Sequence, residues 1–228
     1  MKICLIGDSL TEGRPGISFV NILTEKLPTA TFDNYGKPGE TIKSLHTRLT
    51  KKKLDNHYDL TFLWIGVNDI YSKLMSVQAQ PIANDNEEFK EYYQKVLDIV
   101  LLSSKQVVAV SPAIVGENPM SEPNKELAEL SHIIQSISSQ HAKVTFLNLH
   151  SLFQKHLSEV DSSDFIGTKV SRVMLDVLIY KSTSRIDRLS QKRGLNFTLD
   201  GIHFNSKGAG IVAKEYLSMI ESLIIQDK

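Results

Sequence analysis

The sequence predicts an α/β fold in which helices cover both faces of a parallel sheet. Short β-branched or apolar runs alternate along the 228 residues with segments whose apolar residues recur at helical spacing. Glycine and polar residues follow the first three of these runs, where the ligand-binding loops of such sheets lie. Strand–helix alternation is typical of a parallel sheet, because the helices make the crossovers between its strands.

Five runs are predicted to be strands, and they lie at residues 2–6, 31–34, 60–65, 107–110 and 144–149. Between them, four apolar stripes predict helices: Phe19, Ile22, Leu23 and Leu27; Ile42, Leu45 and Leu49; Phe89, Val96 and Val100; and Leu127, Leu130, Ile134 and Ile137. A final helix is expected to start with Ser206 as its N-cap and to continue to about Ile225.

Composition excludes several classes of partner. The chain is 41% hydrophobic and 23% charged, and its formal net charge of +0 argues against nucleic acid or an anionic membrane as a general partner. No stretch approaches the roughly 20 apolar residues that cross a bilayer, and the short run at 3–6 is unlike a signal peptide. The single cysteine, Cys4, lies in that run, so we expect a buried thiol and a cytoplasmic protein.

The length favours one domain over residues 1–228, with a helical insertion at about 157–196. The insertion contains one apolar stripe, formed by Ile166, Val170, Val173, Met174, Val177 and Leu178, and a second possible helix at Ile186 and Leu189. This hairpin either only packs on the domain, or forms a cap near the site or a homo-oligomer contact. In the cap interpretation, residues 170–178 line the substrate pocket.

Polar residues at the predicted strand ends fit nucleophilic catalysis. A serine hydroxyl needs a base, usually an imidazole held by a carboxylate, and donors for the developing oxyanion. Ser9 directly follows the first strand, and Asp200 precedes His203 by three residues, so that one turn can bring the two together. Gly39 offers an accessible backbone N–H, and Asn68 offers a side-chain amide.

Four sequence blocks together resemble the GDSL/SGNH hydrolase family. The first block is Gly-Asp-Ser-Leu at 7–10, and the second is Gly-Lys-Pro-Gly-Glu-Thr at 36–41. The third is Gly-Val-Asn-Asp at 66–69, and the fourth is Asp-Gly-Ile-His at 200–203. They occur in the family's order and at the predicted strand ends, so the resemblance is specific, and it covers residues 1 to about 223 apart from the insertion.

The resemblance implies a flavodoxin-like three-layer α/β/α sandwich with strand order 2-1-3-4-5. It implies a serine esterase or lipase that acts through an acyl-enzyme, with Ser9 as nucleophile, His203 as base and then acid, and Asp200 orienting the imidazole. The implied oxyanion donors are the N–H groups of Ser9 and Gly39 and the side chain of Asn68. No metal or organic cofactor is implied. The supporting residues of these blocks are Asp8, Gly66 and Asp69.

Two features depart from the commonest family pattern, namely Phe204 directly after the histidine and the insertion before Asp200. Neither removes a catalytic group. The sequence leaves the ester open among short acyl esters, O-acetylated sugars and lysophospholipids, and it leaves open transfer of the acyl group to an alcohol instead of water. A nucleotide- or phosphate-binding module is a weaker alternative, because the first loop lacks the P-loop lysine and Asp8 would repel a phosphate.

Overall fold

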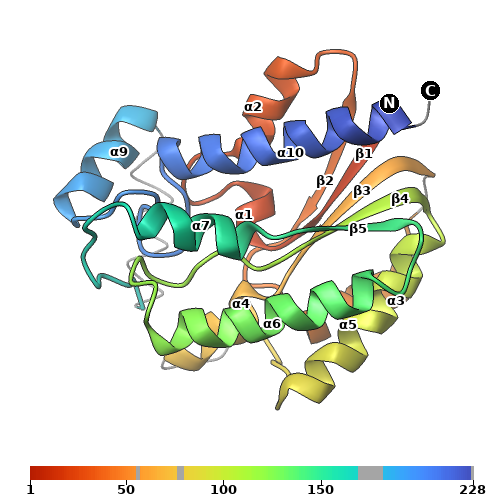
Figure 1. Cartoon of the computed structure of the whole chain (residues 1–228), viewed down its shortest axis with the longest axis horizontal. Coiled ribbons are helices and arrows are strands. Elements are labelled where there is room, and N and C mark those ends of the chain that lie inside the picture. Colours follow the sequence, from red (N-terminus) through yellow and green to blue (C-terminus); the bar gives the residue numbers. More distant parts are fainter. Residues whose placement is uncertain (55–56, 76–79, 169–181, 227–228) are drawn as a thin grey trace.

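The computed structural model describes residues 1–54, 57–75, 80–168 and 182–226. A parallel five-stranded sheet with the order β2-β1-β3-β4-β5 forms its centre (Figure 1). Its strands are β1 (Lys2–Gly7), β2 (Thr31–Gly36), β3 (Tyr58–Trp64), β4 (Ser104–Val110) and β5 (Val144–Leu147). This arrangement confirms the predicted fold class and strand order.

Helices cover both faces of the sheet, as predicted. Helices α2 (Phe19–Lys26) and α10 (Ser206–Gln226) pack together on one face. The other face carries α3 (Ile42–Lys51), α5 (Asn86–Leu101) and α6 (Glu122–Ser138). The remaining elements are α1 (Ser9–Glu12), α4 (Val67–Tyr71), the 3₁₀ helix η1 (Ser72–Leu74), α7 (Leu149–Leu157) and α9 (Thr183–Lys192). The four apolar stripes predicted to form helices lie on α2, α3, α5 and α6, except that Leu27 is the C-cap of α2 and lies just outside it.

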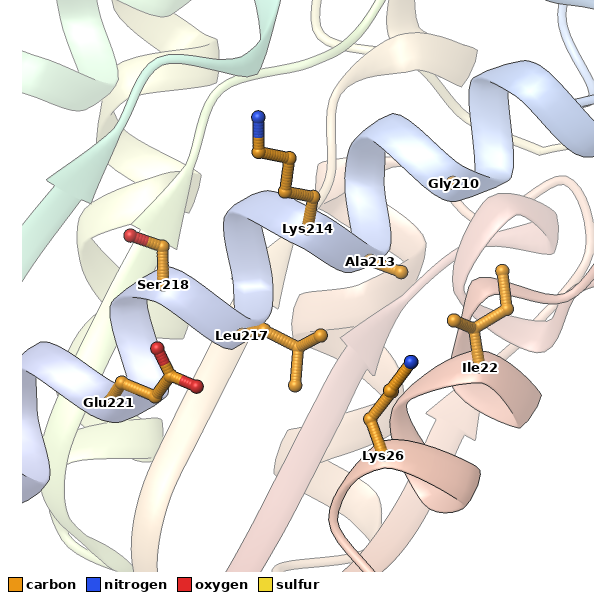
Figure 2. A pocket seen from close by; sticks show the side chains of 8 residues that line it. All are labelled: Ile22, Lys26, Gly210, Ala213, Lys214, Leu217, Ser218 and Glu221. Atoms are coloured by element: carbon orange, nitrogen blue, oxygen red, sulfur yellow. The ribbon is translucent and has the colours of Figure 1, made fainter.

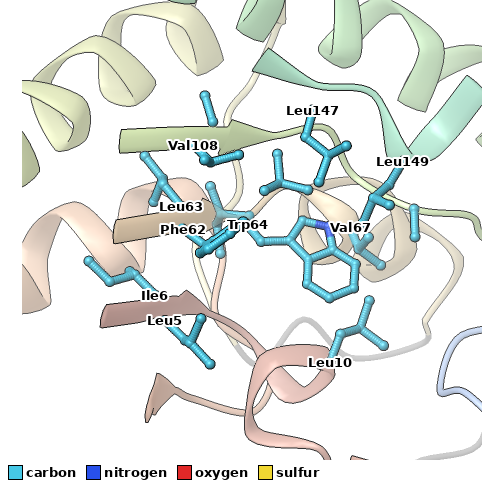
Figure 3. Close-up of a cluster of buried hydrophobic side chains, with 14 of the residues drawn as sticks. Leu5, Ile6, Leu10, Phe62, Leu63, Trp64, Val67, Val108, Leu147 and Leu149 are labelled. Carbon is cyan, nitrogen blue, oxygen red and sulfur yellow. The ribbon is translucent and has the colours of Figure 1, made fainter. Parts of the chain in front are cut away.

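The three central strands are buried almost throughout, because helices shield both of their faces. Figure 3 shows part of this core, where Leu5 and Ile6 of β1 lie beside Phe62 and Leu63 of β3. Cys4 is part of the same core, and burial raises the pKa of its thiol to about 12. Cys4 is therefore the inert core thiol that the sequence predicted.

The structure corrects two predicted boundaries. The fifth strand ends at Leu147 and not at residue 149, because the side chain of Asn148 accepts a hydrogen bond from the Ser151 N–H at 2.9 Å and caps α7. Ser206 is the first residue of α10 rather than its N-cap. The cap is Asn205, whose Oδ1 accepts from the N–H groups of the second and third helical residues at 3.0 and 3.1 Å.

Of the two predicted helices in the insertion, the second is present as α9, while residues 170–178 lie outside the described residues. Helix α7 occupies the segment just before the insertion, where no helix was predicted. No helix in the described ranges is long and apolar enough to span a membrane.

A shallow groove of about 430 Å³ lies between α2 and α10 (Figure 2). Ile22 and Lys26 face it from α2, and Ala213 and Leu217 face it from α10. None of its lining residues comes from the loops that follow β1, β2 or β3. The groove is therefore separate from the predicted site.

Candidate active site

Ser9 occupies an abrupt turn from β1 into α1. Asp8 caps this short helix, and its Oδ1 accepts a hydrogen bond from the Leu10 N–H at 2.9 Å. Ser9 is the first helical residue, so its hydroxyl lies at the carboxyl edge of the sheet directly beyond β1. The serine is 6% exposed, which places it in a largely desolvated site.

A chain of hydrogen bonds joins Ser9 to His203, which lies 194 residues further along the sequence, and joins His203 to Asp200. The Ser9 Oγ lies 3.0 Å from His203 Nε2, and His203 Nδ1 lies 2.8 Å from Asp200 Oδ2. A carboxylate only accepts hydrogen bonds, so it fixes the proton on Nδ1 and leaves the lone pair of Nε2 facing the hydroxyl. In this arrangement the imidazole can take the serine proton.

Backbone N–H groups hold the Asp200 carboxylate as well. Its Oδ1 accepts from the N–H groups of Ile202 at 3.1 Å and His203 at 2.8 Å. Burial alone would raise the pKa of Asp200, but the charge and hydrogen bonds of His203 and the Ile202 N–H outweigh it, so the pKa lies below its usual value. Gly201 makes this tight turn possible, because its φ of +91° is one that L side chains rarely adopt.

The second and third blocks meet beside Ser9. Gly39 has a φ of +72°, and a side chain there would meet open space, so glycine is needed for the left-handed backbone rather than for close approach. Neither the Ser9 N–H nor the Gly39 N–H donates a hydrogen bond to another described residue. Asn68 does: its Nδ2 donates to Asp8 Oδ2 and to the Glu40 carbonyl, both at 3.1 Å. Both amide hydrogens of Asn68 are thus in use.

The carboxyl groups of Asp8 in the first block and Asp69 in the third block are both buried. Burial raises the pKa of each to about 7, despite the backbone N–H donors of Leu10 to Asp8 and of Ile42 to Asp69. A neighbouring carboxyl group adds to each shift, because Asp8 raises the pKa of Asp69 and Glu40 raises the pKa of Asp8.

These raised values predict a pH-dependent stability. An unfolded aspartate titrates near pH 3.9, so between about pH 4 and 7 the folded chain keeps protons that the unfolded chain releases, and stability falls as pH rises through this window. Asp69→Asn keeps an oxygen for the Ile42 N–H but no longer titrates. Between about pH 4 and 7 we expect the free energy of unfolding to fall less in this variant than in the wild type. The difference between the two falls should be about 2 to 4 kcal/mol.

Urea unfolding at a series of pH values measures this difference. Asp59→Asn is the matched control, because a hydrogen bond from Lys105 and the Lys2 N–H lower the pKa of Asp59. In Asp59→Asn the free energy of unfolding should fall between about pH 4 and 7 as much as in the wild type. If Asp69→Asn and the wild type lose the same stability between pH 4 and 7, Asp69 does not hold its proton in the folded chain.

Phe204, the unusual residue after His203, anchors the fourth block in the core. Its ring stacks on Phe153 of α7 at a centroid distance of 5.3 Å and on Trp64 of β3 at 6.0 Å. In Figure 3, Trp64 lies close to Val67, the residue that precedes Asn68. A single aromatic stack therefore connects the segments that carry His203 and Asn68.

The second block is held by a buried ion pair that sequence reasoning missed. Glu40 is 0% exposed, and the Arg48 guanidinium binds both of its carboxylate oxygens, Nε donating to Oε1 at 2.7 Å. Arg48 also donates to the Tyr35 carbonyl at 3.0 Å. Glu40 and Arg48 lie eight residues apart, a spacing that indicates no contact before the loop is folded.

The entry to the insertion lies against the fourth block. The Gly167 N–H donates to the Asp200 carbonyl at 2.8 Å, and the Tyr71 hydroxyl of α4 donates to the Gly167 carbonyl. Burial, with a smaller contribution from Asp200, raises the pKa of Tyr71 to about 12, so it remains a phenol donor. The two ends of the insertion also meet, since the Ser163 N–H donates to the Gly194 carbonyl at 2.8 Å.

All the predicted site residues are therefore brought to one edge of the sheet. The described residues contain no group of three or more histidine, cysteine, aspartate or glutamate side chains that could hold a metal ion. The sequence matches the family model of GDSL-like lipases and acylhydrolases over residues 3–216. The chain belongs to this family. It is a carboxylic-ester hydrolase and not the nucleotide-binding module considered as an alternative.

Solved structures with the same fold include esterases. The GDSL chain resembles the acetyl xylan esterase AlAXEase with a TM-score of 0.68 and 20% identity, over 96% of this chain and 100% of that one. An acetylxylan esterase from Geobacillus stearothermophilus matches with a TM-score of 0.69 and 15% identity, over 95% and 92%. An α/β hydrolase from the metagenome of Lake Arreo, Spain, matches with 0.69 and 16%, over 95% and 93%. A search of curated proteins found no match.

Proposed function

We propose that this esterase cleaves carboxylic esters through an acyl-enzyme on Ser9. The hydrogen-bonded chain from Asp200 through His203 to Ser9 carries the proposal, because it supplies a nucleophile, its base and the group that orients the base. The reaction starts when the Ser9 Oγ attacks the ester carbonyl while His203 Nε2 takes its proton. The alcohol then leaves with that proton, and water cleaves the acyl-enzyme with His203 again acting as base.

The tetrahedral oxyanion is stabilised first by the N–H groups of Ser9 and Gly39, which donate to no other described residue. We propose that the Asn68 amide joins them by leaving one of its two present acceptors, Asp8 or the Glu40 carbonyl. Asp8 supports Asn68 by accepting from its amide, and Asp69 supports the second block by accepting from the Ile42 N–H. Gly66 supports these donors as the N-cap of α4, the helix that carries Asn68.

Variants of one structural neighbour support the assignment of the triad. Three variants of the Geobacillus stearothermophilus acetylxylan esterase are each described as a catalytic mutant, and they replace a serine, an aspartate and a histidine. The same three residue types form the hydrogen-bonded chain here.

An ester panel tests the proposed reaction. Aryl esters of increasing acyl length are run beside an acetylated xylo-oligosaccharide and a lysophospholipid, with and without added alcohol. Hydrolysis of at least one ester, abolished in Ser9→Ala, is the expected outcome. A transferred acyl group on the alcohol would indicate that the acyl-enzyme prefers an alcohol to water. Ester turnover that survives in Ser9→Ala would contradict the proposal.

The pH dependence should report the base. Because His203 must be neutral to accept the serine proton, kcat/KM should rise with pH, between pH 5 and 9, through an apparent pKa set by that imidazole, and then level off. Asp8 titrates close to this range, so the profile is repeated with Asp8→Asn. The rise should persist in that variant. A flat profile in the wild type from pH 5 to 9, with chemistry rate-limiting, would exclude His203 as the base.

We also propose that the protein is cytoplasmic and that the insertion takes part in self-association or in forming the substrate pocket. A cytoplasmic location is supported by the single cysteine, which cannot form an internal disulfide. Self-association or pocket formation through the insertion is supported by the contact of its entry, at Gly167, with Asp200.

A further inference from the structure

The loop between β4 and α6, residues 111–121, carries a buried carboxylate that has no role in the proposed reaction. Glu117 is 2% exposed, and no lysine or arginine among the described residues forms an ion pair with it. Burying a carboxylate is costly unless hydrogen bonds satisfy it. The partners of Glu117 therefore indicate what it is for.

Five donors converge on this carboxylate. Oε1 accepts from the N–H of Phe197 at 2.8 Å and from the N–H and hydroxyl of Thr198 at 2.7 and 2.8 Å. Oε2 accepts from the Asn196 N–H at 2.7 Å and from the Ser162 hydroxyl at 2.8 Å. A carboxylate has about four accepting positions, so its capacity is filled. Ser162 and Asn196 lie near the two ends of the insertion, and Phe197 and Thr198 directly follow it.

Glu117 is aimed at these segments by its own loop. The buried side chain of Asn124 in α6 accepts from the Val115 N–H at 3.0 Å and donates to the carbonyls of Gly116 and Asn118 at 3.3 and 2.8 Å. The loop is thereby folded around one helix residue, and Glu117 projects from its centre. This loop is a rigid support rather than a free surface loop.

Two sets of hydrogen bonds connect Glu117 and its loop to the block that carries Asp200 and His203. The Thr198 hydroxyl donates to Glu117 and accepts from the Gly201 N–H at 3.1 Å, one residue from Asp200. The Gly116 N–H donates to the Gly201 carbonyl at 2.7 Å. The peptide groups on both sides of Gly201 are thus tied to the loop after β4. Asp200 has little freedom to rotate away from the imidazole.

We propose that Glu117 is a positioning residue that holds Asp200, and through it His203, in the orientation that the base needs. Displacing a reacting group by about 1 Å costs on the order of 100-fold in rate. The inference rests on the proposed roles of Asp200 and His203. It adds a residue from a fourth loop that makes no contact with the substrate's reacting atoms.

The test uses two positions in the full chain. Glu117→Gln keeps the shape of the side chain but points an NH₂ group at the two donors from which Oε2 now accepts hydrogen bonds. We expect kcat to fall about 10- to 100-fold, with KM changed less than about twofold. Thr198→Val removes the hydroxyl between Glu117 and Gly201, and about a 10-fold loss is expected. Thr198→Ser keeps the hydroxyl and should restore kcat to near the wild-type value.

Coupling to Asp200 separates positioning from a structural role. In an Asp200→Asn background, adding Glu117→Gln should lower kcat by less than about threefold further. The reason is that the orientation of Asp200, which Glu117 maintains, no longer matters in that background. The acid limb of the kcat/KM profile should shift to lower pH in Glu117→Gln, since a displaced Asp200 stabilises the imidazolium less. Asp59→Asn is the control, because the Asp59 carboxylate also accepts a backbone N–H but lies at the opposite end of β3. This variant should change neither kcat nor the pH profile.

The inference is overturned if Thr198→Val lowers the melting temperature but keeps the wild-type kcat and pH profile. It is also overturned if the losses of Glu117→Gln and Asp200→Asn multiply in full. An inactive Ser9→Ala beside a fully active Thr198→Val rejects the role of Glu117 and leaves the proposed reaction intact. Turnover that persists in Ser9→Ala rejects the reaction itself.

Discussion

Ser9→Ala should lower kcat for a reactive aryl ester by about 10⁴- to 10⁶-fold, the range found when a serine nucleophile is removed from a triad. Alanine cannot form the acyl-enzyme, whereas the donors on Gly39 and the backbone of residue 9 remain. KM should change little, because the Ser9 hydroxyl acts on the reacting carbonyl and contributes little to ground-state binding. Stopped-flow or long-time turnover assays on purified protein measure the loss.

Ser104→Ala is the matched control for this variant. Ser104 is also buried and hydrogen-bonded, with its hydroxyl 2.6 Å from that of Thr61, but it begins β4 at the opposite edge of the sheet from Ser9. Its loss should affect stability and leave kcat within about twofold, as expected for a change away from the site. Equal losses in the two variants would show that Ser9→Ala acts through folding rather than through chemistry.

Asp200→Asn should lower kcat by about 10³- to 10⁴-fold, with the fold intact. The asparagine oxygen can still accept from the N–H groups of Ile202 and His203, so its NH₂ group is left facing His203 Nδ1. A donor at that position favours the tautomer with the proton on Nε2, which cannot accept the Ser9 proton. The loss should therefore be one of catalysis and not of stability.

Asp187→Asn serves as the control for this change. Asp187 also accepts a backbone N–H and a hydroxyl, both from Ser206, at 3.0 and 2.8 Å. It should keep wild-type kcat. If Asp200→Asn retains more than about a tenth of the wild-type kcat while chemistry is rate-limiting, Asp200 does not orient the base.

Residues that are near in sequence, or that follow a strand, could be predicted. Ser9, Gly39 and Asn68 each follow a strand with a clear β pattern, and the carboxyl ends of parallel strands share one edge. Asp200 and His203 lie one turn apart, so their contact needed no knowledge of the fold. The sequence also marks helix α7, because Leu149, Phe153 and Leu157 repeat at helical spacing.

Contacts between distant segments could not be predicted. Glu117 lies 45 to 81 residues from its partners, and most of its donors are backbone N–H groups, which leave no pattern in the side chains. The hydrogen bonds of Asn68 to Asp8 and to the Glu40 carbonyl likewise depend on three loops meeting. Phe204 was recognised as unusual, yet its stacking on Trp64 and Phe153 required the packed core.

Covalent trapping of the nucleophile tests the account most directly. The purified chain is incubated with a fluorophosphonate, digested, and analysed by mass spectrometry of its peptides, beside Ser9→Ala and Asp200→Asn. We predict one phosphonyl adduct, on Ser9, which forms fast in the wild type, slowly in Asp200→Asn and not at all in Ser9→Ala. An adduct on another residue, or continued ester turnover after Ser9 is fully modified, would contradict the claim that Ser9 is the nucleophile.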